Sequence, residues 1–169
     1  MIQKSEIIIT RYASPCGGLL LGSLGENLCL CDWVAENGKR DYVHDRLKRH
    51  LDARFKEGVS HVNVMAACPL DGARHHFDLP VIFVGTEFQK SVWRRLTEIP
   101  YGATVSYREL SCGLGNRQAV RAVARANGAN ALSVIVPCHR VIGSNGSLTG
   151  YAGGLAAKEF LLRLEGAVL

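Results

Sequence analysis

The sequence lacks any apolar run near the roughly 20 residues that a membrane-spanning helix needs. Its first six residues are also not followed by the long apolar region of a secretory signal peptide. From these absences we expect neither a membrane-spanning helix nor an export signal. We therefore expect a cytoplasmic protein that does not contact membranes.

The cysteines lack the C-x₂-C spacing that is typical of zinc sites. Cys29 and Cys31 would point to the same face of a strand, so we interpret them as core residues. A cytoplasmic chain keeps its thiols reduced. The histidines add no specific ligand spacing, and we predict no metal site. The six cysteines are Cys16, Cys29, Cys31, Cys68, Cys112 and Cys138.

Acidic residues are scarce in the second half of the chain. Residues 1–84 carry ten Lys/Arg and ten Asp/Glu, whereas residues 85–169 carry ten and five, so the net charge of +5 lies in the second half. An excess of positive charge favours a polyanionic partner such as nucleic acid. Mildly basic surfaces are common, however, so the charge alone is a modest signal.

The first half predicts a small α+β domain with an antiparallel sheet. Apolar residues recur every four positions over residues 41–55, which predicts a helix. An extended connector containing Pro80 follows over residues 77–85, and we place a domain boundary between residues 84 and 85. Apolar runs between glycine-containing turns predict strands over residues 6–12, 18–22 and 28–34.

The second half predicts a mainly helical domain. Thr86 is a plausible N-cap for a helix that ends at Pro100-Tyr101-Gly102. Two short helices over residues 106–112 and 117–127, joined by a turn, then predict a helix-turn-helix, with Gly128 as the C-cap of the second. The first of these three helices carries an apolar stripe of Phe88, Val92, Trp93, Leu96 and Ile99.

An arginine stripe marks the second helix of this pair. Arg117, Arg121 and Arg125 are four residues apart and would share one face. Small residues such as Ala119 and Val120 keep the helix narrow, so it could enter a DNA groove and contact phosphates. The alternative is a solvated basic face.

The most informative run is Pro137-Cys138-His139-Arg140. It places a thiol beside a potential base, after the apolar residues 134–136, which we interpret as a buried extended segment, and before a turn over residues 143–147. Most buried cysteines are inert, because burial disfavours the thiolate. A neighbouring base would be needed to activate Cys138, and a turn must bring the two side chains together, since neighbours on a strand face opposite ways.

Several blocks of the second half, in the family's order, resemble the O6-alkylguanine-DNA alkyltransferases, also called methylated-DNA–protein-cysteine methyltransferases. The first half resembles the family's N-terminal domain more weakly, through Ser14-Pro15, Gly17 and the strand order. The matching blocks are Phe88–Trp93, Ile99–Gly102, Val105–Tyr107, Ala119–Val123, Pro137–Ile142, Gly150–Gly154 and Lys158–Leu162.

The resemblance implies a fold and a reaction. Residues 1–84 would form a ribonuclease-H-like α+β scaffold, and residues 85–169 the DNA-binding, alkyl-acceptor domain. The alkyl group of an O6-alkylguanine in double-stranded DNA would move irreversibly and stoichiometrically to Cys138, after the base is flipped out through the minor groove. No cofactor is required, and the protein would act as a monomer. Whether O4-alkylthymine is also repaired stays open.

The resemblance also implies residue roles. Cys138 is the nucleophile, His139 removes its proton through a bridging water, and Glu165 orients His139. Tyr107 crowds the adjacent phosphate and supplies a proton to the leaving guanine, while Asn130 braces the active-site turn. Arg121 fills the gap in the base stack, and the other DNA-binding residues of its helix would be Ala119, Val120, Arg117 and Arg125. The substrate pocket would include Val141, Tyr151, Ala152 and Gly153.

Three positions depart from the family pattern. Ala131 stands where a proline usually follows the asparagine, Cys16 where an aliphatic residue is common, and Ala152 where the residue is often polar. No catalytic group is lost. Zinc ligands of some members' N-terminal domains cannot be aligned here.

Three other functions are compatible with parts of the pattern. A lesion-binding relative would flip the base without repairing it, but would carry tryptophan in place of Cys138. A Cys-His hydrolase would not need an arginine-striped helix-turn-helix. A transcription factor with a structural cysteine would keep its whole function without that thiol.

Overall fold

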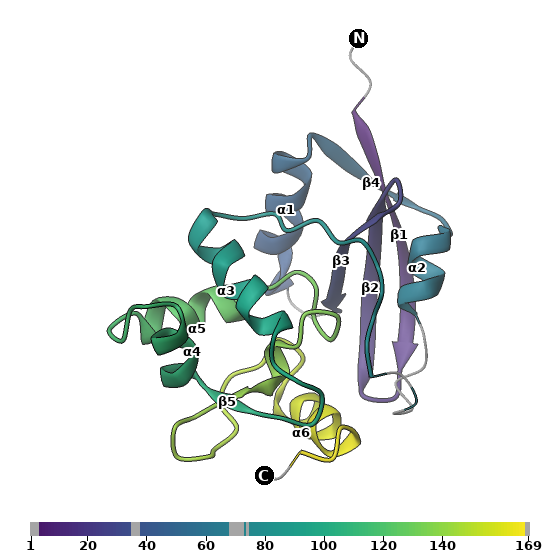
Figure 1. Ribbon diagram of the computed structural model, residues 1–169. Helices are drawn as coiled ribbons and strands as arrows, with labels where there is room; N and C mark the ends of the chain where they lie inside the picture. The colour runs from purple at the N-terminus through teal and green to yellow at the C-terminus, as the bar shows by residue number, and fades with distance from the viewer. Residues whose placement is uncertain (1–3, 35–37, 68–72, 74, 168–169) are drawn as a thin grey trace. The chain divides into compact units, whose positions relative to one another are not determined.

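The computed structural model describes residues 4–34, 38–67, 73 and 75–167 of the chain. It divides the chain into two compact units, Met1–Val84 and Gly85–Leu169. The first unit contains a twisted sheet with helices beside it, and the second is a group of short helices and loops (Figure 1). Within these residues, no helix combines the length and apolar character that crossing a bilayer requires.

The first unit is built on a four-stranded sheet with the order β3-β2-β1-β4. β1 (Ser5–Ser14), β2 (Gly17–Leu24) and β3 (Asn27–Trp33) pair antiparallel, which confirms the predicted antiparallel sheet. Cys29 and Cys31 on β3 are buried, as expected of core residues. Cys68 lies outside the described residues.

The prediction of one helix over residues 41–55 was wrong at its C-terminal end. α1 covers only Asp41–His50, and Ala53–Glu57 form β4, which pairs parallel to β1. The chain turns at Asp52, whose φ is 43°. A four-residue apolar repeat cannot reveal this strand, because pairing to a distant strand outweighs local helix preference.

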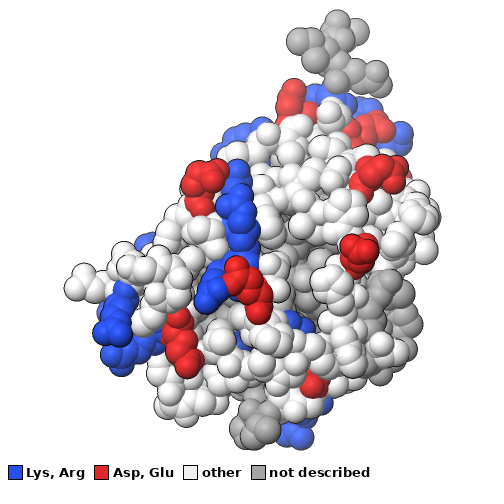
Figure 2. Space-filling view, viewed as in Figure 1, with Lys and Arg blue, Asp and Glu red and all other residues white. Residues whose placement is uncertain are grey.

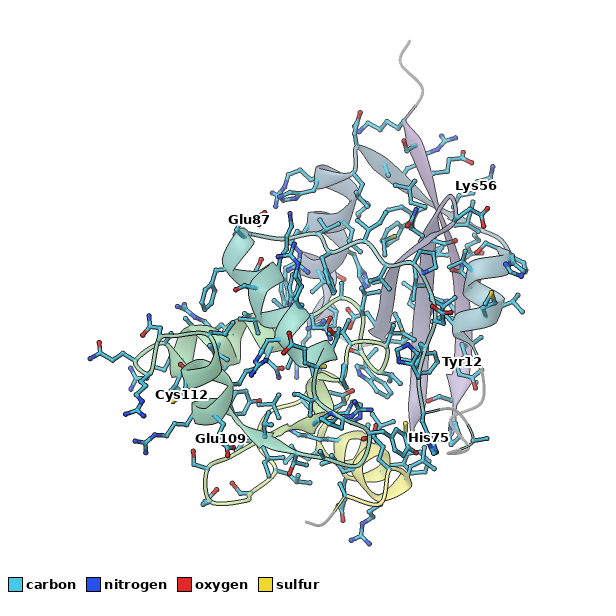
Figure 3. The ribbon with its side chains drawn as sticks, in the orientation of Figure 1. Tyr12, Lys56, His75, Glu87, Glu109 and Cys112 are labelled. Atoms are coloured by element: carbon cyan, nitrogen blue, oxygen red, sulfur yellow. The ribbon has the colours of Figure 1, made fainter. Side chains whose placement is uncertain are left out.

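β4 is an edge strand of the sheet and is held to β1 by side chains as well as by its backbone. Lys56 Nζ lies 2.8 Å from Glu6 Oε2 on β1 (Lys56 is labelled in Figure 3). The short helix α2 (His61–Ala66), which was not predicted, begins after Ser60, whose hydroxyl accepts from the Asn63 amide at 3.0 Å. Six residues are too few for a helical repeat to stand out in the sequence.

The connector over residues 77–85 contains no helix, as predicted. Its middle is attached to the sheet through an isolated parallel bridge between Leu28 and Val81. The Leu28 amide donates to the Pro80 carbonyl at 2.8 Å, and the Ile82 amide donates to the Leu28 carbonyl at 2.9 Å. This segment is therefore part of the first unit's hydrogen-bonded structure.

The second unit begins with α3 (Glu87–Thr97), whose N-cap is Thr86 as predicted. Thr86 and Gln89 form a reciprocal capping box, which satisfies two amides at the start of the helix. Trp93 is 2% exposed, and its indole N–H donates to the Ala126 carbonyl at 2.8 Å. The predicted apolar stripe is buried except for Phe88, which is 41% exposed.

The next two helices are α4 (Tyr107–Gly113) and α5 (Val120–Gly128). α5 begins later than predicted, because Asn116 forms a turn in which its side chain accepts from the Gln118 amide at 3.0 Å. Arg117 therefore precedes the helix and does not belong to the helical arginine stripe. Gly128 is the last helical residue, and Ala129 is the C-cap.

The rest of the second unit combines short elements with one longer helix. β5 (Val105–Ser106) pairs parallel to β6 (Val141–Ile142), and the 3₁₀-helix η2 (Cys138–Arg140) immediately precedes β6. The last helix is α6 (Leu155–Leu164). Residues 134–136 are largely buried but not extended as predicted: they form a turn, with φ of 71° at Val134. A β-branched run indicates burial, but it does not distinguish a strand from a turn held by tertiary hydrogen bonds.

Replacing Thr86 with Ala tests the capping box. The substitution removes the hydroxyl that accepts from Gln89 N, so we expect the free energy of unfolding to fall by about 1 kcal/mol in urea denaturation. Thr97→Ala, at the exposed C-terminal end of the same helix, serves as the control and should change stability by less than about 0.5 kcal/mol. Equal losses in the two variants would contradict a capping role.

Candidate active site

Cys138 lies at the start of η2 and is 3% exposed. Its amide donates to the Val136 carbonyl at 2.7 Å, and the Arg140 amide donates to the Pro137 carbonyl at 3.0 Å. Cys138 and His139 are therefore neighbours in a turn, not on a strand.

Asn130 connects the two ends of the segment that leads to Cys138. Its Nδ2 donates to the Val136 carbonyl at 3.0 Å, and its Oδ1 accepts from the Leu132 amide at 2.9 Å. Both hydrogen bonds are buried. They form although Ala131 follows Asn130, where the family pattern has proline. The side chain thus braces the turn through hydrogen bonds alone.

Behind the turn, the Glu165 carboxylate binds two consecutive side chains of η2. Its Oε1 lies 2.7 Å from His139 Nε2 and 3.0 Å from Arg140 Nη2, and its Oε2 lies 2.8 Å from Arg140 Nε. The Arg140 guanidinium also donates to the Ile99 carbonyl at 2.6 Å. Glu165 is the C-cap of α6, and its side chain is only 7% exposed, so it is not a solvated acid at a helix end.

This arrangement determines the charge and the tautomer of His139. Burial raises the pKa of Glu165, but hydrogen bonds from His139 and Arg140 outweigh burial and lower it to about 2. Burial lowers the pKa of His139, with Glu165 opposing the shift, so His139 is neutral near pH 7. Because an ionised carboxylate only accepts, His139 Nε2 carries the proton and Nδ1 is a free base. Nδ1 is buried and has no hydrogen-bond partner among the described residues.

The turn after α3 completes the surroundings of Glu165. The Gly102 amide donates to Glu165 Oε2 at 3.2 Å, and the Tyr101 hydroxyl donates to the Leu164 carbonyl at 3.3 Å. Gly102 has φ of 75°, and a Cβ there would lie 2.8 Å from the Glu165 carbonyl oxygen. Glycine is therefore required at this position by both conformation and space.

Lys158 is a buried cation on α6, and its amine holds two backbone carbonyls. Nζ donates to Val141 O at 2.6 Å and to Thr149 O at 2.8 Å. Burial lowers the pKa of Lys158 to about 8. The amine therefore joins the strand after the active-site turn to the loop over residues 143–154.

A pocket of about 540 Å³ opens beside Cys138. This volume falls within the range of small-molecule sites. Its wall comes from α4, α5, the segment before η2 and the loop before α6. The lining residues are Tyr107, Val120, Arg121, Ala124, Asn127, Gly128, Asn130, Ser133, Cys138, Thr149, Gly150, Tyr151 and Ala152.

Most of the predicted site residues meet at this place. His139 and Glu165 are joined behind the pocket. The predicted residues that line it are Cys138, Tyr107, Asn130, Arg121, Val120, Tyr151 and Ala152. The remaining predicted residues do not line it. Val141 is fully buried, Arg117 and Arg125 are exposed, and Ala119 and Gly153 are partly exposed beside residues of the wall.

The charged surface of the second unit is mixed over its first helices. Figure 2 shows acidic side chains among the basic ones on the face that carries α3 and α4. α3, for example, carries Arg94 and Arg95 but also Glu87, and Glu98 is its C-cap. Charge alone therefore does not mark a DNA-binding face, and the position of Arg121 at the pocket is the more specific signal.

Within the described ranges, no group of three His, Cys, Asp or Glu side chains is placed to hold a metal ion. Sequence reasoning missed two other polar residues of the site, Asn127 and Lys158. Asn127 Nδ2 lies 3.4 Å from the Cys138 carbonyl oxygen and 3.5 Å from the Tyr107 hydroxyl. Neither residue belongs to a regular spacing of polar residues. The one sequence signal for them would have been a helical period that placed both side chains on an inward face.

Comparisons with known proteins agree on one family. Residues 87–167 match the model described as "6-O-methylguanine DNA methyltransferase, DNA binding domain". The chain is 44% identical over 156 residues to a methylated-DNA–protein-cysteine methyltransferase of Methanosarcina acetivorans, covering 92% of this chain and 96% of that relative.

Solved structures give the same result. A Mycobacterium tuberculosis OGT in complex with DNA has a TM-score of 0.77 and 36% identity, and the match covers 95% of this chain and 92% of that one. The O6-methylguanine-DNA methyltransferase of Pyrococcus kodakaraensis, 24% identical, shares the fold with a TM-score of 0.75 over 95% of this chain and 99% of its own.

Replacing Glu165 with Gln tests the buried carboxylate through pH. Because the folded pKa of about 2 lies below the ordinary 4.5, ionised Glu165 stabilises the fold above pH 4.5, and this contribution is lost as pH falls towards 2. We expect the variant to be less stable than wild type at pH 7 by up to roughly 3 kcal/mol, with the difference shrinking below pH 4.5 in urea denaturation.

The matched control is Glu159→Gln on the same helix. Glu159 pairs with Arg163 at the surface, and an exposed pair contributes at most about 1 kcal/mol. A stability difference for Glu165→Gln that did not change between pH 7 and pH 3 would contradict the ionised, hydrogen-bonded state of Glu165.

Proposed function

Because this chain belongs to the methylated-DNA–protein-cysteine methyltransferases, we propose that it repairs O6-alkylguanine in DNA by transferring the alkyl group to Cys138. The family membership rests on identity across nearly the whole chain. The observation that carries the choice of residue is the position of Cys138 in the pocket wall, with the His139–Glu165 pair directly behind it. A relative that only binds lesions would have no use for this thiol.

The first chemical step is removal of the thiol proton. Glu165 accepts the N–H of His139 Nε2 and leaves Nδ1 as the base, which takes the proton from Cys138 through a bridging water. The positive charge that forms on the imidazole is then stabilised by the adjacent carboxylate. Arg140 neutralises that carboxylate in the resting state, so the buried cluster carries no uncompensated negative charge.

The second step is displacement at carbon. The Cys138 thiolate forms a bond to the alkyl carbon, and the bond between that carbon and guanine O6 breaks with its electron pair remaining on the base. The Tyr107 hydroxyl supplies the proton that the departing guanine needs. The product is a thioether, which has no easy reverse step, so each molecule reacts once.

The base must leave the duplex to reach Cys138. Arg121 lies at the pocket mouth and is exposed on α5, where it can fill the gap that the flipped nucleotide leaves. α4 and α5 would serve as the helix-turn-helix, with the Ala/Val side of α5 entering the minor groove. Since the substrate is DNA and the acceptor is a thiol that must stay reduced, we assign the protein to the cytoplasm.

Mass spectrometry of peptides tests the acceptor. After incubation with a duplex that contains one O6-methylguanine, we expect one methyl group on the Cys138 peptide, restored guanine and no second turnover. Cys138→Ala should abolish transfer while keeping DNA binding, and Cys112→Ser, at the partly exposed cysteine of α4 (Figure 3), should transfer normally. Tight binding of the lesion by wild-type protein without methyl transfer would refute repair and favour lesion recognition.

Replacing Arg121 with Ala tests base flipping. Unstacking a base costs a few kcal/mol, and each 1.4 kcal/mol is a factor of ten, so we expect transfer from duplex DNA to slow at least about tenfold. Transfer from free O6-benzylguanine base, which needs no flipping, should keep its rate. The control is Arg125→Ala, which removes an exposed arginine one turn further along α5 that does not line the pocket; it can weaken DNA binding but should not slow transfer from the bound duplex. A parallel loss with both substrates would show that Arg121 acts in the chemistry and not in flipping.

A further inference from the structure

Asn127 is a buried polar residue in the pocket wall that no role assigned above explains. It lies in the last turn of α5 and is 4% exposed. Its carboxamide is placed between the active-site turn and the first residue of α4. The Tyr107 hydroxyl, on which the proposed reaction depends, and the backbone carbonyl of the proposed nucleophile Cys138 therefore share one neighbour.

The chemistry of the Cys138 carbonyl determines which way the carboxamide faces. A carbonyl oxygen only accepts, so Asn127 must present Nδ2 to it, at 3.4 Å. The same Nδ2 lies 3.5 Å from the Tyr107 oxygen, and an NH₂ group has one proton for each acceptor. The opposite orientation would place Oδ1 against the Cys138 carbonyl oxygen, which is repulsive.

This orientation has a consequence for Tyr107. A hydroxyl oxygen that accepts from Asn127 keeps its own proton for another acceptor. The Thr149 hydroxyl also interacts with Tyr107, but it can donate or accept and therefore does not determine the direction of the proton. Burial raises the pKa of Tyr107, and the hydrogen bonds with Thr149 and Asn127 oppose that rise.

The folding of α5 does not account for this side chain. Asn127 Oδ1 is buried without a hydrogen-bond partner among the described residues, and an unsatisfied buried acceptor costs about 1–3 kcal/mol. A leucine of similar size would avoid that cost. A carboxamide at this position is explained if its N–H groups are needed to bind the Tyr107 oxygen and the Cys138 carbonyl.

We propose that Asn127 is a positioning residue for alkyl transfer: by donating to the Tyr107 oxygen, it directs the tyrosine proton towards the extrahelical guanine as that base departs. The proposal rests on the proposed function, in which Tyr107 is the proton donor. Asn127 touches neither the alkyl carbon nor the Cys138 sulfur in this scheme. Asn127 also donates to the Cys138 carbonyl, and this second hydrogen bond fixes the position of the Asn127 NH₂ group relative to the active-site turn.

The test is single-turnover methyl transfer from an O6-methylguanine duplex by Asn127→Leu, with protein and DNA concentrations varied to separate the maximal rate from binding. We expect the maximal rate to fall about tenfold, a part of the 10²–10⁴ that general acid catalysis supplies. DNA affinity and the rate at which iodoacetamide labels Cys138 should be unchanged. Asn127→Ala, which only removes atoms, is measured beside it in case leucine disturbs packing.

The double variant with Tyr107→Phe gives the decisive comparison. If Asn127 acts through the tyrosine proton, Asn127→Leu adds no further loss once Tyr107→Phe has removed that proton. A wild-type rate for both Asn127 variants, losses that multiply in the double variant, or a parallel fall in iodoacetamide labelling would each overturn the proposal. Failure of the wild-type protein itself to accept the methyl group would instead refute the proposed function.

Discussion

The arrangement of the site depends on one buried carboxylate. Glu165 holds His139 and Arg140, which are consecutive in η2, and it also accepts from Gly102 in the turn after α3. Burying a carboxylate is costly unless charge and hydrogen bonds compensate it, and here each oxygen has such partners. Removing Glu165 would leave Arg140 buried without its counter-charge, so the same carboxylate that binds His139 also stabilises the end of α6.

A second layer of polar side chains supports the backbone around the reaction centre. Asn130 holds the segment before Cys138, Asn127 reaches its carbonyl, and Lys158 holds the Val141 and Thr149 carbonyls after it. The chain is irregular here, so it cannot satisfy its own carbonyls as a helix or strand would. Buried side-chain donors supply the missing partners, and they hold the carbonyls of Val136, Cys138, Val141 and Thr149 in place.

Local signals predicted much of the fold. Three signals depend on only a few neighbouring residues: the capping sequence at Thr86, the glycine turns between the first strands, and the proline after α3. The helix and strands that these signals delimit occur as expected. Predictions failed where distant contacts decide. Phe55 continues a helical repeat but lies on β4, because β1 offers a pairing edge, and Val134 stands in a β-branched run but adopts a left-handed turn conformation.

The sequence by itself determined the family, and it predicted Cys138 as the reacting group and His139 as its base, because Pro137-Cys138-His139-Arg140 and the blocks around it are contiguous in the chain. Only the tertiary structure decided that Glu165, distant in sequence, is buried against His139 and not solvated at a helix end. It also decided that Asn127 and Lys158 face the site, since a single polar residue on a helix carries no local sign of which way it points. Burial, which sets the charge of each of these groups, is a property of the assembled fold.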